Sequence, residues 1–144
     1  MKIIMIFFSV LFCAFANTTS VAQALKNHSF LGRWKVVAVD IDGSRMNAPY
    51  SNSFLEFKEG RYVGFLGCNN FFGNYGVIEQ RHVTIASGGA TKKMCESVLS
   101  NFEMNFLRFF YGDFLSKKVQ GFLLLKNERM QIWLKRFENY AMPY

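Results

Sequence analysis

Several residue types are scarce in this chain of 144 residues, and each scarcity narrows the class of protein. Only 2 residues are proline and 19% are charged, whereas 17% are aromatic. This composition argues against an intrinsically disordered chain, which would be rich in proline and charge and poor in aromatic residues. The length suits one domain, and the sequence shows no internal repeat, linker or low-complexity stretch. It therefore predicts a single globular domain.

Long apolar runs are confined to the N-terminus. Lys2 precedes an apolar stretch from Ile3 to Ala16, and Val21 to Ala24 ends in the A-x-A pattern of a cleavage site. This stretch is too short to cross a hydrocarbon core of about 30 Å as a stable helix. We expect residues 1–24 to be a cleaved signal peptide. A retained anchor and a lipoprotein attached through Cys13 are the alternatives.

The mature chain, residues 25–144, is then expected in an exported compartment. Cleavage after Ala24 would leave it soluble. We expect a monomer. An exported protein rarely meets nucleic acid, so no nucleic-acid partner is expected.

Cysteine is rare, with 3 residues in the chain. Cys13 would leave with the signal peptide, so Cys68 and Cys95 remain. An even number of cysteines in an oxidising compartment predicts one disulfide, and two free thiols are the alternative. A zinc site needs four clustered ligands, which two isolated cysteines do not supply. We therefore expect neither a metal nor a cofactor.

Residues suited to catalysis are equally sparse. A nucleophilic pair would require a free thiolate of Cys68 or Cys95 beside His82, and a disulfide would remove that thiolate. The segment from Gly64 to Gly67 lacks the Lys-Ser/Thr pair that follows a phosphate-binding loop. The few carboxylates mostly adjoin lysines or turn residues, which is typical of solvated positions. The sequence thus predicts a non-enzymatic protein.

Acidic residues are outnumbered, with 10 Asp and Glu against 17 Lys and Arg, which gives a formal net charge of +7. Such a charge favours anionic partners without selecting a fold. The basic residues of the second half suit either of two roles: a patch for anionic lipid head groups, lipopolysaccharide or cell-wall polymers, or solvated faces that protect strand edges. They are Lys92, Lys93, Lys117, Lys118, Lys126, Arg129, Lys135 and Arg136.

The pattern along the chain predicts strands, one helix and further strands. Short β-branched or aromatic segments bounded by turn residues favour strands near 34–39, 54–57, 61–65, 76–78, 82–85, 122–126 and 130–134. Apolar residues at three- and four-residue steps predict one helix at about residues 95–111, with Val98, Leu99, Phe102, Phe106, Phe109 and Phe110 on its apolar face. The prediction is an α+β fold: a small curved antiparallel sheet or cracked β-barrel of about six to seven strands covered by this helix.

One motif carries a family resemblance. The residues Gly67-Cys68-Asn69-Asn70-Phe71-Phe72-Gly73-Asn74-Tyr75 resemble the G-C-N-x-F-x-G-x-Y signature of the META domain family, which includes the bacterial heat-shock protein HslJ. Thr91 to Cys95 resembles the family's T-x-x-x-C segment, and Glu103 lies in the helix that follows. The resemblance runs from about Phe30 to Phe137. The matching motif positions are Gly67, Cys68, Asn69, Phe71, Gly73, Tyr75, Thr91 and Cys95.

The resemblance implies a small sheet-plus-helix or cracked-barrel fold and an association with the cell envelope, heat shock and novobiocin resistance. It would place the cleaved chain in the periplasm or at the periphery of the outer membrane, with an unidentified envelope protein or lipid as partner and with peripheral membrane contact. It implies no catalytic site. The glycines of the motif permit close backbone approaches. Asn69 and Asn70 suit a tight chain reversal, beneath which Phe71 and Tyr75 can pack. We therefore expect the motif to be scaffold, and the protein to be a stress-response or structural interaction module.

The aromatic helix face supports an alternative function. Phe102, Phe106, Phe109, Phe110 and Phe114 exceed what a thin sheet can cover, and would then face a cavity for an acyl chain. The alternative function is accordingly a lipid- or anion-binding module. Ordinary core packing is the simpler interpretation.

Overall fold

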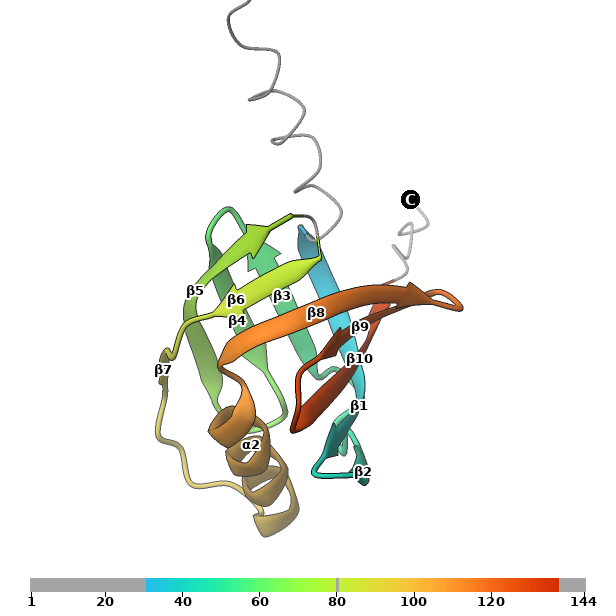
Figure 1. Ribbon diagram of the computed structural model, residues 1–144. Coiled ribbons are helices and arrows are strands. Elements are labelled where there is room, and N and C mark those ends of the chain that lie inside the picture. The colour runs from blue at the N-terminus through green and yellow to red at the C-terminus, as the bar shows by residue number, and fades with distance from the viewer. Residues whose placement is uncertain (1–30, 80, 138–144) are drawn as a thin grey trace, which may run out of the picture.

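The computed structural model describes residues 31–79 and 81–137, which form one antiparallel sheet and one helix (Figure 1). The expected signal peptide, including Cys13 and Ala24, lies outside the described residues. The strands are β1 (Gly32–Ile41), β2 (Ser44–Asn47), β3 (Phe54–Lys58), β4 (Arg61–Phe65), β5 (Asn70–Ile78), β6 (His82–Ile85), β7 (Gly89–Ala90), β8 (Gly112–Val119), β9 (Phe122–Lys126) and β10 (Met130–Arg136). The helix is α2 (Ser97–Phe109).

The sheet closes on itself into a barrel. Its strands follow the order β10-β9-β8-β6-β5-β4-β3-β1, and β1 also pairs with β10. That closing pair is antiparallel and runs from Trp34 opposite Arg136 to Ile41 opposite Met130. Eight strands therefore form the closed wall, while the short β2 and β7 add to β1 and β5. Closure pairs the backbone groups that would otherwise form two open edges.

The α+β class with one main helix is confirmed, but the expected number of six to seven strands was too low. The largest omission is β8, in which Phe114 and Ser116 are buried and Leu115 and Lys117 are exposed. Phe114 was expected on the aromatic face of the helix, but it lies in β8. Phe110 and Phe114 are four residues apart, and this spacing suits one face of a helix and one face of a strand equally well.

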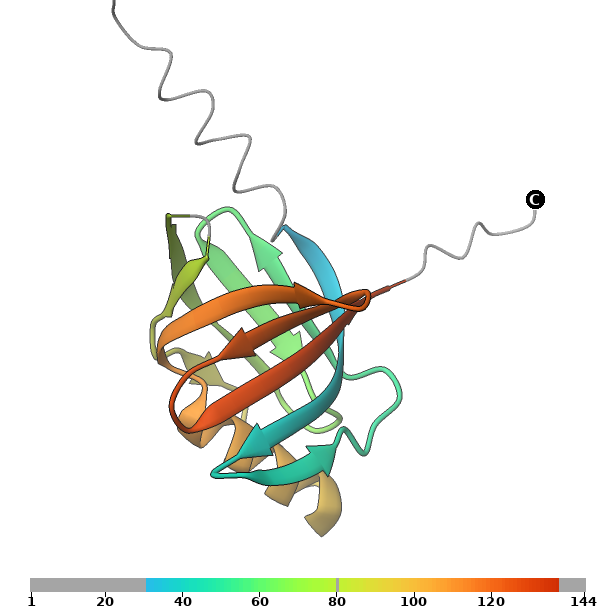
Figure 2. The same cartoon turned by 45° about the vertical axis from the view of Figure 1, so that its right-hand side comes forward.

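Side chains fill the barrel interior. The largest fully buried residues include Phe57, Phe71, Phe106 and Phe114, each at most 1% exposed. Helix α2 lies across one end of the barrel in both views (Figures 1 and 2). It contributes Phe106, whose ring centroid lies 5.7 Å from that of Phe71 and 4.8 Å from that of Phe110. Each buried aromatic ring removes a large apolar area from water, so the helix contributes directly to the stability of the barrel.

The helix lies close to its predicted range, but one residue expected on its buried apolar face is exposed to solvent. Phe102 and Phe106 are buried as expected, whereas Val98 is 57% exposed. Val98 belongs to the first turn of α2, which extends away from the barrel (Figure 1). The apolar spacing therefore indicates the correct face, but only its C-terminal part meets the core.

A glycine on β4 makes room for a core ring, and this arrangement can be tested. Gly64 pairs with Phe71 of β5, and a Cβ at Gly64 would overlap the Phe71 ring. Since that ring also packs against Phe106, we expect Gly64→Ala to lower the free energy of unfolding by about 1–3 kcal/mol in urea titrations. Gly76→Ala is the matched control, because a Cβ there meets no atom within 4 Å. An equal loss in both variants would contradict the interpretation.

Candidate functional site

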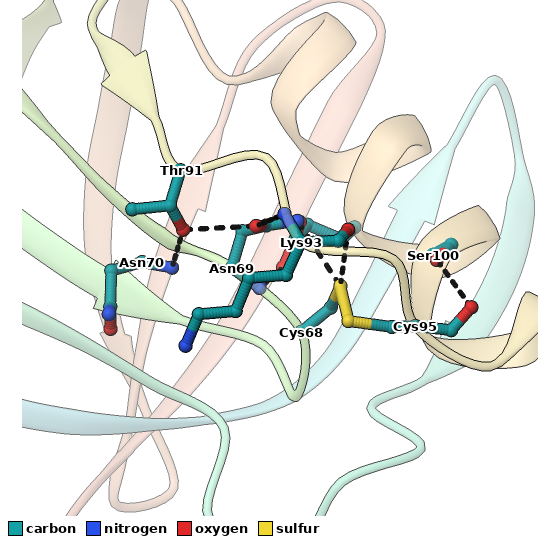
Figure 3. Close-up of a disulfide and its surroundings, with 8 residues drawn as sticks. Cys68, Asn69, Asn70, Thr91, Lys93, Cys95 and Ser100 are labelled. Atoms are coloured by element: carbon teal, nitrogen blue, oxygen red, sulfur yellow. Dashed lines mark hydrogen bonds between the residues drawn. A yellow bond between two sulfur atoms is a disulfide. The ribbon is translucent and has the colours of Figure 1, made fainter.

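The signature segment is joined to the start of the helix by a disulfide (Figure 3). Cys68 lies in the turn between β4 and β5, and Cys95 lies just before α2. Their sulfur atoms are bonded, the Cα atoms are 5.8 Å apart, and the two cysteines are 27 positions apart in sequence. This is the pair that the cysteine count predicts. A cysteine nucleophile activated by His82 would need a free thiolate. Both sulfur atoms are in the disulfide, so neither cysteine supplies one.

Asn69 is the centre of a hydrogen-bond network beside the disulfide. Its Oδ1 accepts from the Thr91 hydroxyl at 2.9 Å and from the Lys93 backbone N–H at 2.7 Å. Its Nδ2 donates to the Glu103 carboxylate at 2.7 Å and to Cys68 Sγ at 3.2 Å. The amide of this buried side chain therefore joins the turn, the segment before the helix and the helix itself.

Glu103 is a carboxylate inside the protein, only 4% exposed, on the buried face of α2. Both of its oxygens accept hydrogen bonds from Asn69: Oε2 from the backbone N–H and Oε1 from Nδ2, each at 2.7 Å. Among the described residues, no basic side chain forms an ion pair with Glu103. Burying a carboxylate is costly unless hydrogen bonds offset its lost hydration, so these two donors are central to the site.

Thr91 attaches the segment before the helix to the first residue of β5. Its hydroxyl accepts from the Asn70 N–H at 3.1 Å while donating to Asn69. Its own N–H donates to the Asn70 carbonyl at 2.9 Å. Thr91 thus continues the pairing that β7 makes with β5, and this pairing leads the chain from the barrel wall to Cys95.

The motif differs in one respect from the expected chain reversal. Within residues 67–75, all of them described, only Gly67 has a positive φ, at 114°, and Asn70 already begins β5. A Cβ at Gly67 would lie 2.9 Å from both Tyr50 Cβ and Leu99 Cδ2. The turn therefore depends on this glycine, while Asn69 bonds residues distant in sequence instead of its own backbone.

The remaining motif positions support the barrel wall. Gly73 pairs with Tyr62, and a Cβ at Gly73 would overlap the tyrosine ring. Tyr62 donates its hydroxyl to the Ala86 carbonyl at 2.9 Å, and burial raises the pKa of Tyr62. Phe71 is in the core, and Tyr75 packs edge-to-face on Phe57 at 4.9 Å. Each of these motif residues thus has a structural contact.

The aromatic residues proposed to face a ligand lie mainly in the core. Phe102, Phe106 and Phe110 are buried, and Phe109 lies on the side of the helix beneath the Arg129 guanidinium, 4.4 Å from its ring centroid. A cavity of about 120 Å³ lies beside Phe71, Phe110 and Leu107. Typical ligand pockets have volumes of roughly 300–1,000 Å³. This cavity has little space for an acyl chain.

The basic residues do not gather into one patch. Arg129 binds Asp42 through two contacts of 2.9 and 2.6 Å, and this pair holds the pKa of Asp42 below its ordinary value. Arg136 donates to the Leu31 carbonyl at 2.6 Å and lies over the Trp34 ring. Lys92 and Lys93 precede α2, and Lys118 lies near the β8–β9 turn. Only Lys117, Lys126 and Lys135 share the outer face of β8, β9 and β10.

Within residues 31–79 and 81–137, no three His, Cys, Asp or Glu side chains come close enough together to hold a metal ion. No helix in these ranges has the length and hydropathy needed to cross a membrane.

Fold and site together define a class of protein: a small closed antiparallel barrel with one end covered by a helix that a disulfide joins to the wall. The profile of the META domain family matches residues 25–138. The chain belongs to the META domain family, and the resemblance seen in the signature is confirmed.

Solved structures share this fold at low sequence identity. The chain is similar to an NMR structure of a protein from Burkholderia xenovorans, with a TM-score of 0.63 and 16% identity over 78% of this chain and 86% of the other. A second NMR structure gives a TM-score of 0.57 and 15% identity, with coverage of 76% and 92%. A comparison with curated protein sequences finds no match.

Proposed function

We propose that this protein is a non-enzymatic, exported domain of the bacterial cell envelope that works by binding, as a stress-response or structural interaction module. The observation that carries the proposal is the internal use of the family signature. Asn69 is hydrogen-bonded to Glu103 and Thr91, and the two cysteines are bonded to each other. Residues engaged in this way hold the helix on the barrel and are not presented to a substrate, so binding falls to the outer surface.

The disulfide supports export, because disulfides persist in oxidising compartments and are rare in the cytosol. Cys68 and Cys95 are both engaged in it. The N-terminal pattern that ends at Ala24 points in the same direction. Family association with the envelope and with heat shock adds the expectation of a stress role.

A ligand-binding alternative has more room outside the barrel than under the helix. A hollow of about 580 Å³ lies between β4, β5 and the Ser87–Gly89 segment, and Arg61 and Phe72 line it. Phe72 is 54% exposed there, although it is a large aromatic side chain. Arg61 and Phe72 together would suit a small ligand with an anionic and an apolar part.

The proposal is tested first by the intact mass of the protein isolated from its host, with and without reduction before alkylation. We expect a mass that corresponds to cleavage after Ala24, with no thiol alkylated until reduction. A mass that retains Cys13 with acyl chains would identify an anchored lipoprotein. An uncleaved chain with free thiols in the cytosol would contradict the proposed compartment.

The stress role needs a separate measurement. Deleting the gene should increase sensitivity to heat or novobiocin, and the full-length chain should restore resistance. The matched control is a chain that starts at residue 25 and remains in the cytosol, which should not restore it. Equal rescue by both chains would contradict a function in the envelope.

A further inference from the structure

The outer surface of β8, β9 and β10 combines apolar and basic side chains in an unusual way. Figure 2 shows these strands at the front of the barrel. We call this surface the lysine–aromatic face. It consists of Leu115, Lys117, Val119, Phe122, Lys126, Gln131, Trp133 and Lys135, with Leu124 among them but only 9% exposed. The outer wall of a barrel that faces only water would alternate inward apolar with outward polar residues, but here many outward positions are apolar.

Strand register brings these side chains together. Leu124 pairs with Lys117 on one side and with Trp133 on the other. Phe122 pairs with Val119 and Lys135, and its ring meets that of Trp133 edge-to-face at 6.0 Å. Leu115, which is 53% exposed, pairs with Lys126. Each apolar residue on the face therefore has a lysine beside it or one strand away.

The charge of the face is positive. Strands β9 and β10 contain no acidic residue, and Lys117, Lys126 and Lys135 are all exposed. The carboxylate that borders the face on β1, Asp40, accepts from Trp133 Nε1 at 2.8 Å and pairs with Arg45 at 3.8 Å. Asp113, at the start of β8, accepts from the Thr84 hydroxyl at 2.6 Å.

Protection of strand edges accounts for only part of this set of lysines. Lysines on open edges prevent pairing with other chains. In the closed barrel, β8 is bonded to β6 and β9, β9 to β8 and β10, and β10 to β9 and β1. Along this face β9 and β10 are paired on both sides, whereas β8 pairs with β6 only from Gly112 to Leu115. Edge protection can therefore explain Lys117 but does not explain Lys126.

We propose that the lysine–aromatic face binds peripherally to a bilayer surface that carries anionic head groups. Lysine stems can lie along apolar surface while their ammonium groups reach phosphate, and Trp and Phe favour the membrane–water interface. Basic charge and exposed apolar area together strengthen binding to anionic membranes. A soluble acidic polymer would use the charge but leave Leu115 and Phe122 without a role. The inference deepens the proposed function by naming its partner, and it rests on that function for the compartment.

The test uses the exported protein with its disulfide intact and vesicles of phosphatidylcholine with or without phosphatidylglycerol. In co-sedimentation, we expect binding only to the anionic vesicles, weakened by added salt. The triple variant Lys117→Gln, Lys126→Gln, Lys135→Gln should lower the partition coefficient by roughly 100-fold, since each basic residue near such a surface contributes about a factor of five. The matched control replaces the exposed Lys58, Lys92 and Lys93 by Gln, which removes the same charge elsewhere and should cost less than about fivefold.

A second measurement locates the contact. Lipids with brominated acyl chains should quench the fluorescence of Trp133, whereas Trp34, 5% exposed in the core, should be unaffected. Trp133→Phe should remove most of the quenching. The inference is overturned by absence of binding to the anionic vesicles, by equal loss in both triple variants, or by equally tight, lysine-dependent binding to soluble polyphosphate. If export and the disulfide are observed but the protein does not bind the vesicles, the membrane-binding inference is wrong while the proposed function stands.

Discussion

Replacing Asn69 by Asp should lower the free energy of unfolding by about 3–5 kcal/mol at neutral pH. The change has nearly the same shape, but it removes the Nδ2 donor that lies 2.7 Å from Glu103 Oε1 and puts a second carboxylate there. Two carboxylates in a buried site cannot both stay charged without strong repulsion. Urea unfolding of the oxidised protein at neutral pH measures the loss.

Two comparisons separate this effect from a general effect of charge. Asn74→Asp introduces the same charge at an exposed position of β5 and should change stability by less than about 0.5 kcal/mol. The loss in Asn69→Asp should shrink at acidic pH, because protonation of one carboxyl group removes the repulsion. A loss no larger than that of Asn74→Asp would mean that the Asn69–Glu103 contact contributes little to stability.

Removing the disulfide should cost a similar amount. For Cys68→Ser with Cys95→Ser, chain entropy alone predicts a loss of about 3–4 kcal/mol for cysteines 27 residues apart. A domain of this size has a total stability of only about 5–15 kcal/mol, so urea unfolding should show the change clearly.

The wild-type protein under reducing conditions is the control for the serine substitutions and should lose the same stability. If the double variant loses less than about 1 kcal/mol of unfolding free energy, the hydrogen-bond network holds the helix without the disulfide. A large difference between the reduced wild type and the double variant would instead point to a local effect of serine.

The two cross-links connect the same parts of the molecule. The disulfide and the Asn69 network both join the turn after β4 to the segment that leads into α2. Loss of one therefore leaves the other to position the helix, whose Phe106 fills the end of the barrel. We expect the two losses to be non-additive in a double-mutant cycle, because neighbouring sites with shared partners couple.

Part of the site could be predicted from the sequence because it depends on residue type. The cysteine count pointed to Cys68 and Cys95, and the signature indicated that Asn69 and Thr91 matter. The role of Glu103 could not be derived, because Asn69 lies 34 residues away and a lone glutamate in a helix gives no sign of burial. The Asn69 side chain was expected to bond its own backbone, but most of its hydrogen-bond partners are distant in sequence.

The sequence by itself determined the α+β class, the helix near residues 95–111, most of the strands and the family, because each follows from local periodicity or from a contiguous motif. Only the tertiary structure decided that β1 pairs with β10, that aromatic side chains fill the barrel, and that lysines and aromatic residues share one outer face. The physical reason is distance along the chain. Spacing within a segment indicates which of its faces is buried, but Trp34 and Arg136 lie near opposite ends of the described chain and become neighbours only in the folded barrel.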